Sequence, residues 1–68
     1  MSFTIKQARL FADKTQQEMA DFLGIHVQTY RKLEENPAKA TVEQAQKISE
    51  ITGIPYDQIF FANKLYLK

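Results

Sequence analysis

The chain carries five short segments in which apolar residues recur at helical spacing, separated by polar signals for helix starts and stops. The first segment begins at Thr4, and its residues Ile5, Ala8 and Ala12 share one face. The other four segments cover about residues 15–23, 27–35, 42–52 and 55–61. The pattern therefore predicts an all-α domain of five helices.

Three threonines stand at the predicted helix starts, and each is followed three residues later by glutamine or glutamate. The pairs are Thr4 with Gln7, Thr15 with Glu18, and Thr41 with Gln44. In this spacing, called a capping box, the two side chains satisfy amide groups that a helix start leaves unpaired. We therefore expect a helix to begin at each of these threonines.

Two glycines and an Asn-Pro pair mark the expected helix ends. Gly24 follows the second segment and suits the left-handed backbone that ends many helices, and Gly53 ends the fourth segment. Asn36 is expected to adopt the same conformation after the third segment, and Pro37 prevents that helix from continuing. A tight turn at Gly24 thus joins the second and third helices.

The apolar faces of the predicted helices identify the expected core of a single domain, residues 1–68, with the core at about residues 4–61. Beyond the first segment, the inward residues are Met19, Ala20, Leu23, Ile25, Tyr30, Leu33, Val42, Ala45, Ile48, Ile51, Ile59 and Phe60. In the remaining tail, residues 62–68, leucine alternates with lysine and tyrosine, which is the period of a strand. We expect this tail either to extend across to a second copy of the chain or to fray.

The size and composition narrow the class of protein. A chain of 68 residues forms one domain with a modest core. It contains no cysteine, which excludes disulfides and thiolate metal sites. No apolar run approaches the roughly 20 residues of a membrane helix, and the N-terminus lacks the blocks of a signal peptide. We therefore expect a cytoplasmic protein without membrane contact.

No group of residues indicates catalysis. His26 is the only histidine, whereas a metal site needs several convergent ligands. Only two glycines are present, so a glycine-rich phosphate loop is excluded. The eight carboxylates are spread along helix faces. We expect a non-enzymatic protein with no catalytic residue, metal, cofactor or small-molecule ligand.

Residues 15–36 carry the most specific pattern, a short helix, a tight turn at Gly24 and a second helix. This is the helix-turn-helix arrangement, in which the second helix enters the major groove of DNA. If Tyr30 and Leu33 face the core, the second helix turns four other residues outward. These residues are Val27, Gln28, Arg31 and Lys32. Glutamine can bind adenine, arginine and lysine can bind guanine, and valine can contact the thymine methyl group, so we expect base contacts here.

Further polar residues border this face and are expected to contact DNA phosphates. Free amides at helix N-termini bind phosphates, which favours Gln16 and Gln17. The other candidates are His26, Thr29 and Lys39. His26 also stands at the capping position of the third helix, where histidine is unusual. The alternative interpretation is an ordinary polar surface.

Arg9 and Glu34 are expected to meet where the first predicted helix packs against the third. A partly buried pair of this kind would fix the packing of the helices rather than bind DNA. The alternative interpretation is a pair of unrelated surface charges.

The stretch Thr-Gln-Gln-Glu-Met-Ala-Asp-Phe-Leu-Gly-Ile-His-Val-Gln-Thr-Tyr-Arg-Lys-Leu-Glu-Glu-Asn, residues 15–36, resembles the lambda-repressor-like, Cro/C1-type (XRE family) helix-turn-helix. The likeness covers residues 4–60, and Gly-Ile-Pro-Tyr-Asp-Gln-Ile-Phe at residues 53–60 is similar to the last helix of that family. The chain departs from the family pattern at three places. His26 replaces a hydroxyl cap, Asn36-Pro37 replaces a glycine-basic loop, and Pro55 replaces a serine cap.

The resemblance implies a five-helix domain that binds operator DNA, usually as a homodimer on an inverted repeat. It also implies a phosphate contact from Gln16, base contacts from the four outward residues, and an internal salt bridge between Arg9 and Glu34. Short members are similar to phage or mobile-element repressors and Cro proteins, which suggests a bacterial or phage source.

We therefore expect a DNA-binding transcriptional regulator. The net charge of +1 counts mildly against nucleic acid, because DNA-binding domains are usually more basic. The alternative is a protein-interaction module, of the antitoxin or anti-repressor type, that uses the same fold without DNA. Salt-dependent DNA binding would separate the two functions.

Overall fold

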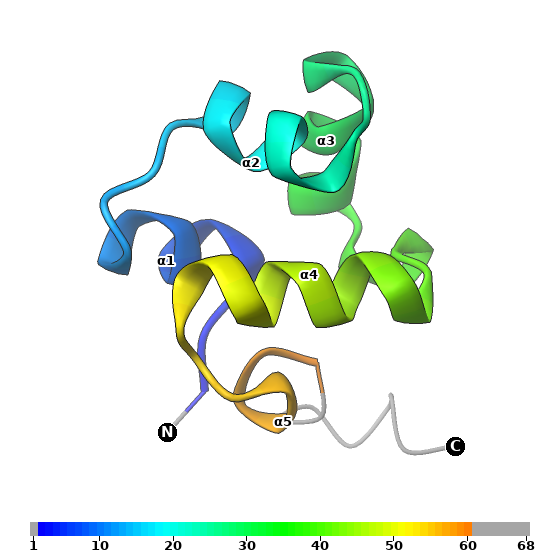
Figure 1. The fold of residues 1–68 in the computed structure, drawn as a ribbon. Coiled ribbons are helices and arrows are strands. Elements are labelled where there is room, and N and C mark those ends of the chain that lie inside the picture. Colours follow the sequence, from blue (N-terminus) through cyan, green and yellow to red (C-terminus); the bar gives the residue numbers. More distant parts are fainter. Residues whose placement is uncertain (1, 61–68) are drawn as a thin grey trace.

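The computed structural model describes residues 2–60 as a set of short helices packed around one core (Figure 1). The α-helices are α1 (Ile5–Phe11), α2 (Gln16–Leu23), α3 (Val27–Glu35), α4 (Val42–Thr52) and α5 (Tyr56–Ile59). One 3-10 helix, η1 (Pro37–Lys39), follows α3. The all-α fold of five helices is confirmed, and residues 2–60 contain no strand. The predicted tail, residues 62–68, lies outside the described residues.

The three capping boxes form as predicted. Before α1, α2 and α4, the threonine hydroxyl accepts a hydrogen bond from the third amide of the helix. In return, the side-chain oxygen of Gln7, Glu18 or Gln44 accepts one from the threonine amide, at 2.8–2.9 Å. Each helix start is thereby fixed by local sequence alone.

The chain ends α2 and α4 with the predicted glycines in the left-handed conformation, at φ +72° for Gly24 and +76° for Gly53. The prediction for Asn36 is wrong, because this residue has φ −140° and ψ 83°. The ring of a following proline restricts the residue before it to extended conformations. Pro37 therefore ends α3 by forcing Asn36 into an extended backbone, and the chain continues into η1.

The core is made of the apolar faces of all five helices, and α4 crosses the middle of the domain between α1, α2 and α5 (Figure 1). Its largest fully buried side chains are Tyr30, Ile5, Met19 and Ile48. The predicted core position at Val42 is wrong. This residue is 65% exposed, because the first residue of α4 lies at the edge of the core. Ile51 is only half-buried but packs against the core.

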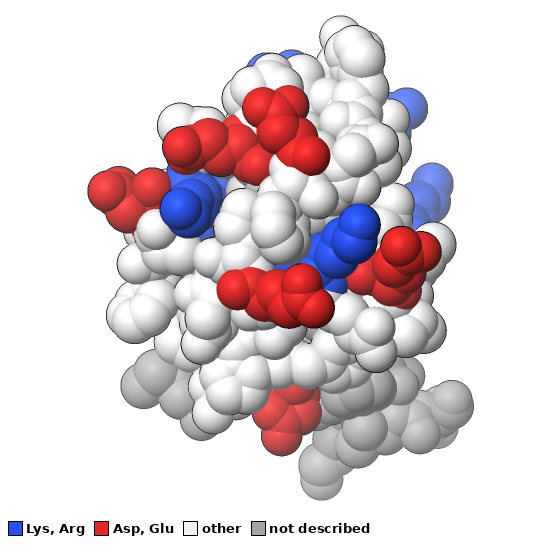
Figure 2. Space-filling view, viewed as in Figure 1, with Lys and Arg blue, Asp and Glu red and all other residues white. Residues whose placement is uncertain are grey.

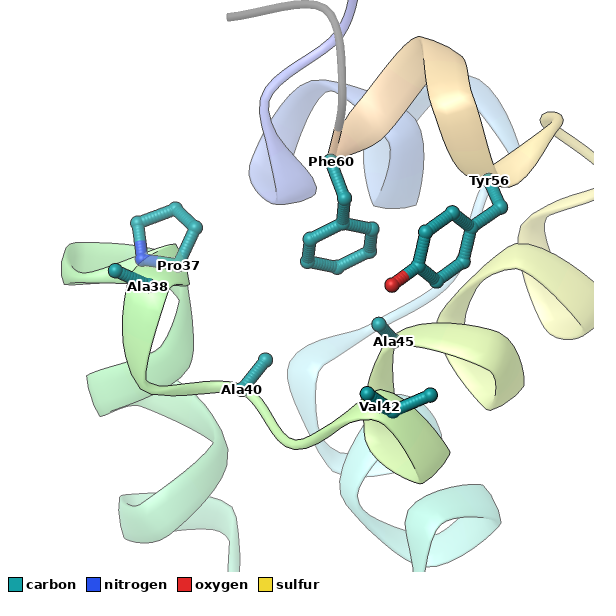
Figure 3. Close-up of a pocket in the computed structure, with 7 residues that line it drawn as sticks. All are labelled: Pro37, Ala38, Ala40, Val42, Ala45, Tyr56 and Phe60. Carbon is teal, nitrogen blue, oxygen red and sulfur yellow. The ribbon is translucent and has the colours of Figure 1, made fainter. Parts of the chain in front are cut away.

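A shallow apolar groove opens between η1, α4 and α5 (Figure 3). Its volume is about 250 Å³, and its lining residues are Pro37, Ala38, Ala40, Val42, Ala45, Tyr56 and Phe60. The rings of Tyr56 and Phe60 lie on one wall with their centroids 5.3 Å apart. Among residues 2–60, no charged side chain lines this apolar groove, so this part of it suits an apolar contact rather than a charged ligand.

Candidate nucleic-acid interface

The turn between α2 and α3 is fixed by two backbone hydrogen bonds. The amide of Ile25 donates to the carbonyl of Ala20 at 3.0 Å, and the amide of Gly24 donates to the carbonyl of Asp21 at 3.1 Å. This pair is the Schellman motif, which needs a left-handed residue at the position of Gly24. The motif sets the angle at which α3 leaves α2, and the two helices pack together more extensively than any other pair.

His26 caps the start of α3. Its Nδ1 accepts a hydrogen bond from the amide of Gln28 at 3.3 Å. An imidazole nitrogen can accept a hydrogen bond only when it carries no proton. The cap therefore requires the form of His26 in which Nδ1 is unprotonated and the ring N–H is on Nε2. That N–H is not used by the cap and remains available as a donor at the edge of the α3 surface.

The outer face of α3 matches the predicted division between core and surface. Tyr30 is fully buried and Leu33 is 4% exposed, so both point into the core. Gln28, Arg31 and Lys32 are exposed on the other side of the helix, as is Thr29. Val27 is only partly exposed, because its side chain also packs against the core. Three of the four predicted base-contacting residues are thus exposed.

A buried carboxylate, Glu34, joins α1, α2 and α3. Its Oε2 accepts hydrogen bonds from Nε of Arg9 and from the hydroxyl of Tyr30, both at 2.6 Å. Its Oε1 accepts a third hydrogen bond from Nε2 of Gln16 at 3.0 Å. The side chains of Arg9 and Glu34 are only 10% and 7% exposed, so the predicted pair is an internal salt bridge. Nη1 of Arg9 also donates to the carbonyl of Lys14 at 3.0 Å, which ties the pair to the α1–α2 loop.

This environment keeps Glu34 ionised. Burial by itself raises the pKa of the carboxyl group, but the hydrogen bonds from Arg9, Tyr30 and Gln16 outweigh burial and hold the pKa below its usual value. The hydrogen bond to Glu34 raises the pKa of Arg9. Burial is the largest cause that raises the pKa of Tyr30, and the hydrogen bond to Glu34 is the second. The hydroxyl of Tyr30 therefore keeps its proton and remains a donor. The three groups therefore form a stable ionic cluster near neutral pH.

Gln16 connects this cluster to the outer surface of α3. While its Nε2 donates to Glu34, its Oε1 accepts a hydrogen bond from Nε of Arg31 at 3.1 Å. The structure thus joins the predicted pair of Arg9 and Glu34 to two residues that the sequence singled out separately, Gln16 and Arg31.

The remaining predicted phosphate-contacting residues stand apart from this network. Nε2 of Gln17 donates to Oδ1 of Asp21 at 2.9 Å along the exposed side of α2. Thr29 is exposed on α3, and Lys39 is exposed on η1. Within residues 2–60, neither Lys32 nor Lys39 forms an ion pair. Their contacts with DNA stay predictions.

Figure 2 shows acidic and basic side chains interspersed over the face of the domain on which α4 lies. This face carries no continuous basic area, in line with a net charge of +1. Because the net charge of the chain is only +1, attraction to DNA phosphates depends on where the basic groups lie rather than on the total charge.

The contact between the hydroxyl of Tyr30 and Glu34 was not predicted from the sequence. The two residues are four apart on α3, which is the spacing at which helical side chains meet, so the signal was present. The link from Gln16 to Arg31 had no such signal, because it joins two helices across 15 positions.

Residues 2–60 contain no candidate for two other kinds of site. No cluster of three or more histidine, cysteine, aspartate or glutamate side chains there could hold a metal ion. None of the helices described in this range is long and apolar enough to cross a membrane.

Comparison with known proteins identifies the family. A family model described as "Helix-turn-helix" matches residues 5–59, from the start of α1 to the end of α5. No curated protein and no solved structure matches the chain. The matched family is one of DNA-binding regulators, and its fold is lambda-repressor-like. The geometry of α2, Gly24 and α3 agrees with that match, and the chain belongs to the Cro/C1-type (XRE) helix-turn-helix family.

Proposed function

We propose that this protein is a sequence-specific transcriptional regulator that places α3 in the major groove of an operator. One observation carries the proposal: α3 exposes Gln28, Arg31 and Lys32 on the side opposite the buried Tyr30 and Leu33. Glutamine, arginine and lysine are among the side chains that bind base edges through paired or multiple hydrogen bonds. A rigid helix that carries all three fits direct recognition of bases.

The proposed contacts divide into two groups. Gln28, Arg31 and Lys32 bind bases, and the exposed part of Val27 contacts a thymine methyl group. The phosphate contacts come from the border of this face. They are assigned to Gln16, Gln17, His26, Thr29 and Lys39. The N–H of His26 that the cap leaves free supports its role as a phosphate donor.

We further propose that the protein binds an inverted repeat as a homodimer, as a repressor or Cro-like protein of a phage or mobile element. Two-fold symmetry in a dimer matches two half-sites about one helical turn of DNA apart. The apolar groove supports this proposal, because Val42 at its edge is 65% exposed and a second copy would cover it. Such a regulator acts in the cytoplasm of a bacterial cell.

A salt titration tests the proposal against the protein-interaction module. Affinity for a preferred duplex and for a scrambled duplex is measured from low to physiological salt. We expect both affinities to fall with salt, while the preference for the first duplex persists, since phosphate contacts depend on salt and base contacts supply sequence preference. A folded protein that binds neither duplex at low salt contradicts DNA binding and favours the interaction module.

A further inference from the structure

The side chain of Gln16 has only one orientation that suits its neighbours. An ionised carboxylate can accept hydrogen bonds but cannot donate them, so the atom of Gln16 that faces Glu34 must be the Nε2 amine. The amide oxygen then points the other way, toward Nε of Arg31. If the amide were reversed, Oε1 of Gln16 would face the carboxylate of Glu34 and the NH2 group would face the guanidinium of Arg31. Both hydrogen bonds would then be lost.

The anchor of this arrangement is rigid. Glu34 is 7% exposed in its side chain, and Arg9 and Tyr30 both donate to its Oε2 at 2.6 Å. The other oxygen is left for Gln16. The orientation of the Gln16 amide is therefore set by a salt bridge whose two side chains are nearly buried.

The effect reaches the DNA-facing surface through Arg31. The bond from Nε to Gln16 holds the side chain at one point, while Nη1 and Nη2 at its outer end form no hydrogen bond with the side chains or backbone of residues 2–60. These two nitrogens form a planar pair that can donate to O6 and N7 of one guanine. An unheld arginine would lose more side-chain freedom when it binds, so the hold favours this contact.

We propose that Gln16 is a positioning residue for base recognition. It holds Arg31 by Nε, so that the end of the guanidinium group that carries Nη1 and Nη2 is directed at a guanine. This inference rests on the proposed function, since it assigns Arg31 to a guanine. Gln16 retains a second N–H on Nε2, so a phosphate contact from the same side chain remains compatible with the hold.

The test replaces Gln16 with methionine, which keeps the length of the side chain and removes both hydrogen bonds. Discrimination is measured as the ratio of affinities for the preferred duplex and for duplexes changed at each position in turn. Arg31→Ala identifies the base that Arg31 contacts as the position where discrimination is lost. We expect Gln16→Met to lower discrimination at that same position by about threefold to tenfold, part of what a bidentate contact supplies.

Two controls separate positioning from other effects. Gln46 is exposed on α4, and Gln46→Met is expected to change no ratio. In the Arg31→Ala background, Gln16→Met is expected to cause no further loss of discrimination. If Gln16→Met instead weakens binding to every duplex equally, Gln16 contacts phosphate only and the proposal is overturned.

A second measurement needs no DNA. In the free protein, the Nε–H signal of Arg31 in an NMR spectrum is expected to exchange slowly with solvent and to lose this protection in Gln16→Met. Unchanged exchange in the variant would overturn the hold on Arg31. A protected signal together with no DNA binding at all would leave the hold intact and contradict the proposed function instead.

Discussion

Arg9 and Glu34 form an ion pair between α1 and α3, with Nε 2.6 Å from Oε2 and both side chains nearly buried. Removing one partner of such a pair leaves the other charge buried without compensation. We expect Arg9→Met to lower the free energy of unfolding by about 3–5 kcal/mol. That is a large part of the total for a domain of this size.

Urea denaturation followed by circular dichroism measures this loss. The matched control is the exposed pair of Lys47 and Glu43 on α4, with atoms 3.9 Å apart. Lys47→Met is expected to cost less than about 1 kcal/mol, because solvent screens exposed pairs. Equal losses in the two variants would show that the buried pair has no special role.

The depressed pKa of Glu34 makes stability depend on pH. Because the folded state favours the ionised carboxylate, its contribution is fully present above the pKa of the unfolded chain, about 4.3, and is lost as the pH falls through the lower folded pKa. We expect the melting temperature of the wild type to fall more steeply below about pH 4.3 than that of Glu34→Gln. Glu43→Gln, at the exposed pair, should follow the wild-type curve. Parallel curves for all three proteins would contradict the assignment.

Gly24 and Gly53 provide a matched pair for the cost of a left-handed backbone. A Cβ atom at either position meets nothing within 4 Å, so the positive φ is the only penalty. We expect Gly24→Ala and Gly53→Ala each to lower stability by about 1 kcal/mol, after the smaller gain from a stiffer unfolded chain. Thermal melts compare the two. A much larger loss at Gly24 would mean that the α2–α3 turn tolerates no adjustment.

Gln28 lies on the exposed face of α3 and is expected to bind one base. Gln28→Ala should relax sequence preference at a single position, at a cost of about 1–3 kcal/mol there. Competition binding with duplexes changed one base pair at a time gives this profile. Gln46→Ala, on the exposed side of α4, serves as the control. An unchanged profile in Gln28→Ala would remove this residue from the base-contacting set.

The apolar groove and the tail are two separate candidates for the contact between subunits of the dimer, and each is tested by its own variant. Val42→Glu adds a charge at the edge of the groove, and it leaves α4 intact because acidic residues favour a helix start. We expect this variant, and a chain lacking residues 65–68, to dimerise more weakly in analytical ultracentrifugation. If Val42→Glu sediments like the wild type, the groove is excluded as the dimer contact. If the shortened chain sediments like the wild type, the tail is excluded.

The helices could be predicted because their limits are set locally. Thr15 and Glu18 fix a helix start within four residues, and Gly24 fixes its end, so no tertiary contact is needed. Asn36 was mispredicted because two local signals compete, and the constraint from Pro37 prevails. Val42 was mispredicted because helical spacing cannot tell whether a first-turn residue reaches the core.

The candidate interface was predictable in outline only. The inward direction of Tyr30 and Leu33 follows from helical spacing and defines which side of α3 faces outward. The path from Glu34 through Gln16 to Arg31 depends on the angle between α2 and α3, which the sequence pattern does not contain. The pair of Arg9 and Glu34 was predicted, but its extension through Gln16 to Arg31 had to come from the structure.

Selection from a random duplex library at low salt, followed by sequencing, is the most direct test of DNA recognition by α3. We expect the wild-type protein to enrich an inverted repeat whose half-sites lie about one helical turn apart. Arg31→Ala should enrich the same repeat with one guanine position relaxed. A folded protein that enriches no sequence would contradict specific DNA recognition, and the protein-interaction module would then be the better explanation of this helix-turn-helix domain.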